Sequence, residues 1–308
     1  MINFKYQDKG TVVHRPNPLA KLAWVGGILI LSLVFNNPLY ILFLFIAVLS
    51  LVLVARIWRE WASVMRLGFW LCISIIVINV LVSYHGSHVL IEAPFKLPVL
   101  GTPVITVEAI VFGAVMALRL LVIISAFTLL NITVHPDDIM SALLKMKLPY
   151  KSVLVTSLST RFIPCLVEDV ERISGVHRAR GLELDRGNWL GKLKNRAVIT
   201  IPLLANSLDR AVQVAEAMES RAFGTGQKRT FYKELKMTRI DAVTLAFSIL
   251  PFVFGILLRL TGYEDYQYYP TFETINIGVS EWLMLFIMVF LLMAILPLAL
   301  AKRRFELD

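Results

Sequence analysis

Long apolar stretches alternate with short polar ones along most of the chain. A membrane-spanning helix needs about 20 apolar residues, and six stretches approach or exceed that length. They run from about Pro18 to Phe35, Leu39 to Ala55, Leu67 to Ser83, Thr106 to Thr133, Ala242 to Leu260, and Trp282 to Ala301. Asn17 can cap the first of these helices, and Lys21 is expected to extend toward lipid headgroups. The pattern predicts an all-α, polytopic membrane protein with about six transmembrane helices.

A polar stretch of about a hundred residues separates the fourth and fifth predicted spans. Apolar residues recur within it at helical spacing, which predicts two amphipathic helices. The first runs from Ile163 to Arg180, with Pro164 in its first turn and Gly181 ending it. The second ends before Gly224 and carries a heptad-like apolar stripe. The stripe consists of Leu204, Leu208, Ala211, Ala215, Met218 and Ala222.

The distribution of charge predicts the orientation of these helices. Basic residues gather before the first span, between the second and third, in residues 135–240, and at the C-terminus. The loop from Tyr84 to Thr106 has only Lys96, and the loop from Thr261 to Ser280 has none. Basic loops stay on the cytoplasmic side of a membrane. We therefore expect a multi-pass protein of the inner (cytoplasmic) membrane with both termini in the cytoplasm.

This orientation divides the chain into three parts. Residues 1–134 form an N-terminal membrane part with four helices, and residues 241–308 form a C-terminal membrane part with two. Residues 135–240 form a cytoplasmic helical segment between helices four and five.

Composition supports a bilayer protein, because 57% of the residues are hydrophobic and only 17% are charged. The net charge of +9 is explained by cytoplasmic loops, so we expect no nucleic-acid partner. Cys72 and Cys165 are not expected to form a disulfide. His85 and His88 lack further ligands for a metal site. Without a phosphate-binding loop or a zinc-protease motif, the sequence predicts no catalytic residue, no cofactor and no enzyme activity.

Two arginines stand in similar surroundings in the cytoplasmic segment. Arg180 lies in Ala179-Arg180-Gly181, and Arg221 lies in Ser220-Arg221-Ala222. Each occupies the last turn of an amphipathic helix, where the helix dipole favours a cation. Capping and contact with lipid phosphate therefore explain both arginines. Their duplication favours a second interpretation, in which two similar helix ends meet two similar receptors, as in a two-fold ATPase dimer.

Arg119 lies in the middle of the fourth predicted span. A charge at that depth costs roughly 2.5–3.5 kcal/mol on insertion scales, so it needs a polar partner. A backbone carbonyl, Asn79 or a group on a partner protein would serve, as would a polar pocket reached by tilting the helix.

Several motifs together resemble the transmembrane (T) component of energy-coupling factor transporters, over most of the chain. They are His14-Arg15-Pro16-Asn17-Pro18 with Lys21, Thr133 to Ile139 followed by Leu148-Pro149, Arg161-Phe162-Ile163-Pro164, Ala179-Arg180-Gly181, and Ala217 to Gly224. The last motif departs from the family pattern, because Ser220 and Ala222 flank its arginine where the family has alanine and glycine.

The resemblance implies that the segment 135–240 couples two ABC ATPase subunits to a substrate-binding S component. Its arginine ends would dock in the ATPases, and ATP-driven motion would support vitamin uptake, cobalt transport or import of a related micronutrient. The ATPase-coupling residues would be Ala179, Arg180, Gly181, Ser220, Arg221 and Ala222. The stripe with Leu204, Leu208, Ala215 and Met218 would face either the S component or the chain's own helices.

The same residues agree less well with two other functions. An integral-membrane enzyme, such as a lipid-modifying transferase, needs a cluster of polar residues at the membrane interface, and the polar residues here are scattered. A self-contained channel or carrier needs broken helices or a polar path through the membrane. Arg119 alone gives little support for such a path. The substrate is not readable from this sequence, because the S component would select it.

Overall fold

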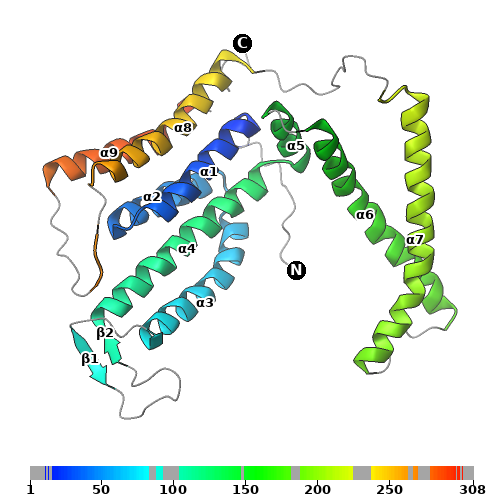
Figure 1. The fold of residues 1–308 in the computed structure, drawn as a ribbon, viewed down its shortest axis with the longest axis horizontal. Helices are drawn as coiled ribbons and strands as arrows, with labels where there is room; N and C mark the ends of the chain where they lie inside the picture. The colour runs from blue at the N-terminus through cyan, green and yellow to red at the C-terminus, as the bar shows by residue number, and fades with distance from the viewer. Residues whose placement is uncertain are drawn as a thin grey trace. The chain divides into compact units, whose positions relative to one another are not determined.

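The computed structural model describes residues 11, 13, 16–82, 88–92, 104–146, 149–181, 188–224, 237–262, 266–269, 278–295, 297, 298 and 300. The described residues form helices and one small two-stranded sheet. The chain divides into two compact units (Figure 1). The first unit comprises Met1–Ile139 and Leu235–Asp308, and the second comprises Met140–Glu234.

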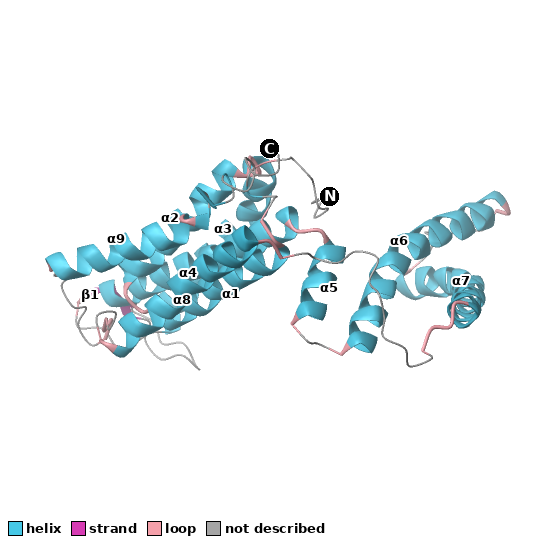
Figure 2. Cartoon of the chain, turned by 90° about the horizontal axis from the view of Figure 1, so that it is seen from above, coloured by secondary structure: helices cyan, strands magenta, loops and turns pink. Residues whose placement is uncertain are grey.

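The first unit is a bundle of apolar helices that run side by side (Figures 1 and 2). Its helices are α1 (Pro18–Val34), α2 (Pro38–Val54), α3 (Trp58–Val82), α4 (Val107–Thr133), α8 (Arg239–Leu260) and α9 (Val279–Met293). By length and composition, α3, α4 and α8 can cross a membrane, whereas α1, α2 and α9 are shorter apolar helices. The predicted all-α class is confirmed.

Close contact between α1 and α8 depends on small residues. A Cβ atom added at Gly255 would lie 2.3 Å from Leu31 Cδ2, and one added at Gly27 would lie 3.3 Å from Phe252 Cβ. Leu31 and Phe35 are fully buried at this contact. Helices in membranes approach through such small residues because lipid gives little hydrophobic drive for their association.

The third predicted span was placed too late, because α3 begins at Trp58 rather than Leu67. Only Ala55, Arg56 and Ile57 separate α2 from α3. The Ile57 N–H donates to the Val52 carbonyl at 3.3 Å, and Arg56 has a φ of 56°. Together, this hydrogen bond and the positive φ form a left-handed helix ending. Such an ending allows α2 to stop and α3 to start within three residues. Arg59 and Arg66, which suggested a loop, are instead helical, whereas Arg56 lies in the corner.

The ends of the last two helices also differ from the prediction. α8 begins at Arg239 rather than Ala242, because Thr238 and Asp241 form a reciprocal capping box. α9 begins at Val279 rather than Trp282 and ends at Met293, with Ala294 as its cap.

A β-hairpin lies in the loop that was predicted between the third and fourth spans. β1 (Val89–Glu92) pairs antiparallel with β2 (Val104–Thr106), and Val89 lies opposite Thr106. Glu108 is fully buried beneath it and accepts from the His88 backbone N–H at 3.2 Å, while its Oε1 lies 2.8 Å from His88 Nδ1. His88 therefore joins the hairpin to the start of α4. His85 lies outside the described residues.

The second unit contains two long helices, α6 (Tyr150–Ala179) and α7 (Trp189–Ser220), while α5 (Pro136–Lys145) spans the division between the units. The predicted start of the first amphipathic helix near Pro164 was wrong. Pro164 lies inside α6, and Pro202 lies inside α7. Proline in a helix interior removes one backbone hydrogen bond, which long helices tolerate as a local bend.

Candidate functional site

The end of α7 places Arg221 in a defined backbone motif. The Ala222 N–H donates to the Glu219 carbonyl at 2.9 Å, and the Phe223 N–H donates to the Met218 carbonyl at 2.9 Å. These two bonds make a Schellman ending, which requires a left-handed residue directly after the cap. Ala222 is that residue, with a φ of 57°. Arg221 is therefore the cap of α7.

Arg180 occupies the equivalent position on α6. It is the cap residue, with φ −83° and ψ 7°, and Gly181 follows it with a φ of 83°. The Gly181 N–H donates to the Arg178 carbonyl at 3.0 Å, which matches the Ala222 bond at the other end. The predicted helix ending at Gly181 is confirmed. Two arginines thus project from the same backbone position of two helices.

All six residues predicted around these arginines are exposed in the structure: Ala179, Arg180, Gly181, Ser220, Arg221 and Ala222. They do not form one site, because α6 and α7 cross with opposite chain directions. The rings of Tyr150 and Phe223 lie 6.3 Å apart, so the end of α7 lies beside the start of α6. A helix with the 30 residues of α6 is about 45 Å long. The arrangement suits two separate protein contacts rather than one small-molecule site.

An ionic cross-link joins the two helices between these ends, and the sequence analysis missed it. Asp169 on α6 is only 3% exposed, and its Oδ2 accepts from Arg210 Nη2 on α7 at 2.8 Å. Its other carboxylate oxygen accepts from Arg172. A buried carboxylate needs such partners because burial removes its hydration. A signal was present, since Asp169 lies on the apolar side of its helix, three residues after Leu166 and four before Ile173.

The apolar stripe of α7 is largely uncovered in the structure. Leu204 and Leu208 are each 58% exposed, Ala215 is exposed, and Met218 is partly buried. Ile201 and Val212 extend the same exposed surface along the helix. Contiguous exposed apolar surface of this kind marks a site of protein or membrane contact. Packing on the chain's own described helices does not bury Leu204 or Leu208.

Arg119 takes part in a helix-end contact inside the first unit. Its Nη2 donates to the Phe35 carbonyl at 2.6 Å, and the same nitrogen lies 3.5 Å from Asn36 Oδ1. Phe35 caps the end of α1, where carbonyls are left without helical partners. Asn79 instead donates to the Ile75 carbonyl at 2.9 Å. Among the partners considered, the structure therefore shows a backbone carbonyl.

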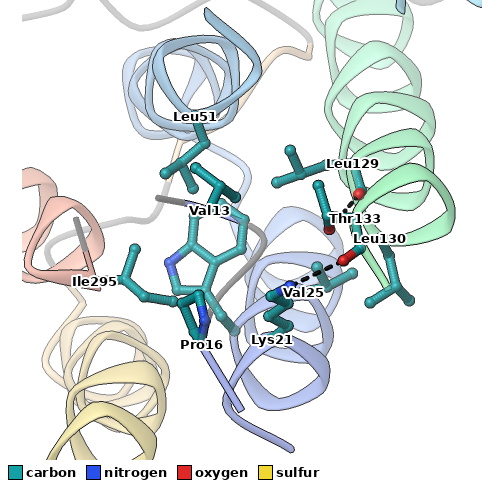
Figure 3. A pocket seen from close by; sticks show the side chains of 10 residues that line it. Val13, Pro16, Lys21, Val25, Leu51, Leu129, Leu130, Thr133 and Ile295 are labelled. Carbon is teal, nitrogen blue, oxygen red and sulfur yellow. Dashed lines mark hydrogen bonds between the residues drawn. The ribbon is translucent and has the colours of Figure 1, made fainter. Parts of the chain in front are cut away.

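The expectation that Lys21 extends to the headgroups was wrong. Lys21 is 7% exposed, and its Nζ donates to the Thr133 carbonyl at 2.9 Å, as Figure 3 shows. The cation stabilises the C-terminal end of α4, where the helix dipole is negative. A cavity of about 20 Å³ beside it, lined by Pro16, Trp24 and other residues, has room for one water molecule. Lys21 thus joins the start of α1 to the point where the chain leaves α4.

The residue after the cap arginine differs between the two ends, Gly181 on α6 and Ala222 on α7, which gives a matched pair of substitutions. We expect Gly181→Ala to weaken the end of α6 by about 1 kcal/mol, because alanine resists a left-handed φ. Space is not limiting, since nothing lies within 4 Å of a Cβ added at Gly181. Ala222→Gly should stabilise the end of α7 by a similar amount. Hydrogen exchange of the amides of residues 181 and 222–223 measures both, and changes of the same sign would contradict this account.

Comparison with known proteins supplies the family. The family model described as cobalt transport protein, CbiQ, matches residues 9–232. Similar proteins include one from Listeria innocua, 30% identical over 80% of this chain and 93% of its own length. Another, from Streptococcus equi subsp. equi, is 32% identical over 82% of this chain and 94% of its own length. Both are named energy-coupling factor transporter transmembrane protein EcfT, so the relatives are transport components and not enzymes.

Proposed function

Because the chain belongs to the CbiQ family of transmembrane components of energy-coupling factor transporters, we propose that it transmits ATP-driven motion of two ABC ATPase subunits to an S component. The cargo would be a vitamin, a metal ion or a related micronutrient, and the family description makes cobalt one candidate. One observation carries the proposal. Arg180 and Arg221 cap two helices in equivalent backbone positions at opposite ends of a crossed pair.

Each arginine end would dock in one ATPase subunit. A guanidinium presents several N–H donors in a planar fork, which suits a groove lined by carboxylates or carbonyl oxygens. Two equivalent ends suit two equivalent or similar subunits. Movement of the ATPases toward or away from each other would then change the angle between α6 and α7.

The cross-link at Asp169 would make α6 and α7 move as a crossed pair about one point. Arg210 and Arg172 hold its carboxylate from both helices. The exposed stripe with Leu204 and Leu208 would then carry the movement to the S component. Covering it would remove apolar surface from water, worth about 25 cal/mol for each Å².

The proposed topology has six spans, with both termini and the second unit in the cytoplasm. The helices α1 and α2, with 17 residues each, would be about 25 Å long and would need local thinning of the bilayer. Membrane-impermeant maleimide applied to cells should label Gln267→Cys, an exposed position between α8 and α9. It should not label Glu216→Cys on α7, with Cys165→Ser as the background. The reverse labelling pattern would exclude this topology.

The proposed function is tested by purifying the tagged chain from its native membrane. Two ATPase subunits and a small membrane protein should co-purify in fixed stoichiometry, and mass spectrometry identifies them. The purified chain alone should hydrolyse no ATP, because the sequence has no phosphate-binding loop. ATP hydrolysis by the isolated chain, or purification without any ATPase subunit, would contradict the proposal.

A further inference from the structure

The first turns of α3 present two different faces. One face packs on α4, where Trp61 Nε1 donates to Ser125 Oγ at 3.1 Å. A Cβ added at Gly68 would lie 3.4 Å from Leu121 Cδ2, so the helices are close here as well. A helix turns about 100° per residue, so Arg59, Ser63, Arg66 and Trp70 fall on the side away from α4.

That outer side is exposed and changes character along the helix. Arg59, Ser63 and Arg66 are exposed, and Trp70 is 70% exposed. Beyond Trp70 the exposed residues on the same side are mainly apolar, with Ile73 and Val77 beside Ser74. The stripe therefore begins with two cations about 10 Å apart along the helix and continues as a hydrophobic surface.

The groups of a phospholipid follow a matching order from polar to apolar, with the phosphate at the interface and the acyl chains below it. Arginine binds phosphate oxygens through paired N–H donors, and the Ser63 hydroxyl adds a third donor group between the two arginines. An exposed tryptophan such as Trp70 suits the boundary between headgroups and chains. Attraction of each basic residue to an anionic leaflet adds to binding.

The start of α3 is also held in place, which a lipid site needs. Ala55 and Ile57 are fully buried in the short corner that precedes it. The Trp61 N–H donates to the Ile57 carbonyl at 2.9 Å, so the helix is regular from its first turn. We propose that the outer side of α3, formed by Arg59, Ser63, Arg66 and Trp70, binds the headgroup of an anionic phospholipid. This site lies in the first unit and does not depend on the arginine ends of α6 and α7.

The test measures lipid binding to the full-length purified chain by native mass spectrometry in detergent. Phosphatidylglycerol should bind about tenfold more tightly than phosphatidylcholine. Arg59→Gln with Arg66→Gln should abolish that preference. Lys145→Gln with Lys151→Gln removes the same charge from exposed positions on α5 and α6 and should leave the preference unchanged. Unchanged thermal stability of the α3 variant shows that it is folded.

Three results would overturn the proposal. The first is a phosphatidylglycerol preference that persists in the Arg59→Gln, Arg66→Gln variant. The second is displacement of phosphatidylglycerol by excess inorganic phosphate, which would identify a site for free phosphate. The third comes from replacing Ser63 by the photo-crosslinker p-benzoylphenylalanine in cells. Crosslinks to another membrane protein instead of lipid would show that this side of α3 is a protein interface.

Discussion

Replacing both cap arginines, as Arg180→Glu with Arg221→Glu, should abolish substrate uptake and release the ATPase subunits. Each single variant should weaken ATPase association by about tenfold or more, because a carboxylate would replace the guanidinium that the proposed ATPase groove receives. The effects should combine, since the two ends lie on different helices about 45 Å apart by helix length. Co-purification of the ATPases and uptake by cells measure the two effects.

The folded chain should survive these changes. Both arginines are exposed, and reversing a charge at a helix end costs about 1 kcal/mol or less. Arg161→Glu is the matched control, because Arg161 is exposed in the middle of α6 and away from both ends. It should leave ATPase association intact. Normal uptake by the double variant with its ATPases bound would reduce Arg180 and Arg221 to ordinary helix-end cations.

Asp169→Asn should have the largest effect on the stability of the second unit. An amide cannot neutralise Arg210 and Arg172, and Arg210 is two-thirds covered, with 32% of its side chain exposed. We expect the free energy of unfolding of the α6–α7 pair to fall by about 2 kcal/mol. Hydrogen exchange of the α6 and α7 amides measures this loss. Uptake should also fall while the ATPases remain bound, because the docking ends are intact but no longer move together.

The neighbouring acid offers a control for this experiment. Asp209 precedes Arg210 on α7 and is exposed. Asp209→Asn makes the same chemical change without touching the cross-link, and both exchange rates and uptake should stay near those of the unsubstituted chain. Equal effects of the two substitutions would mean that the buried ion pair has no special part in holding the helices.

The sequence predicted those features that depend on neighbouring residues. Thr106 to Thr133 was recognised because apolar residues fill the span, and Gly181 was recognised as an ending because glycine favours a positive φ. Hydropathy located the apolar part of α3 but not its start, because Arg59 and Arg66 continue the helix beyond the apolar part. Ala222 also adopts a positive φ, which could not be predicted because alanine does not favour that conformation.

Contacts between residues far apart in the chain could not be predicted from the sequence. Asp169 pairs with Arg210 and Lys21 reaches Thr133, across separations of 41 and 112 residues. Neither separation follows from a helical period, because each depends on how two helices pack. The equivalence of Arg180 and Arg221 was suggested by their motifs, but the hydrogen bond that both endings share, from the residue after each cap, required coordinates.

The contact between α1 and α8 sets an order for biosynthesis. Leu31 and Phe35 pack against Gly255, which the ribosome adds only after all of the second unit has been made. At about 5–20 residues per second, translation needs roughly 10–50 s to pass from α1 to α8. The glycine-lined side of α1 must spend that interval against lipid or the insertion machinery. The membrane bundle of the nascent chain therefore stays open at its oldest helix until α6 and α7 have already left the ribosome.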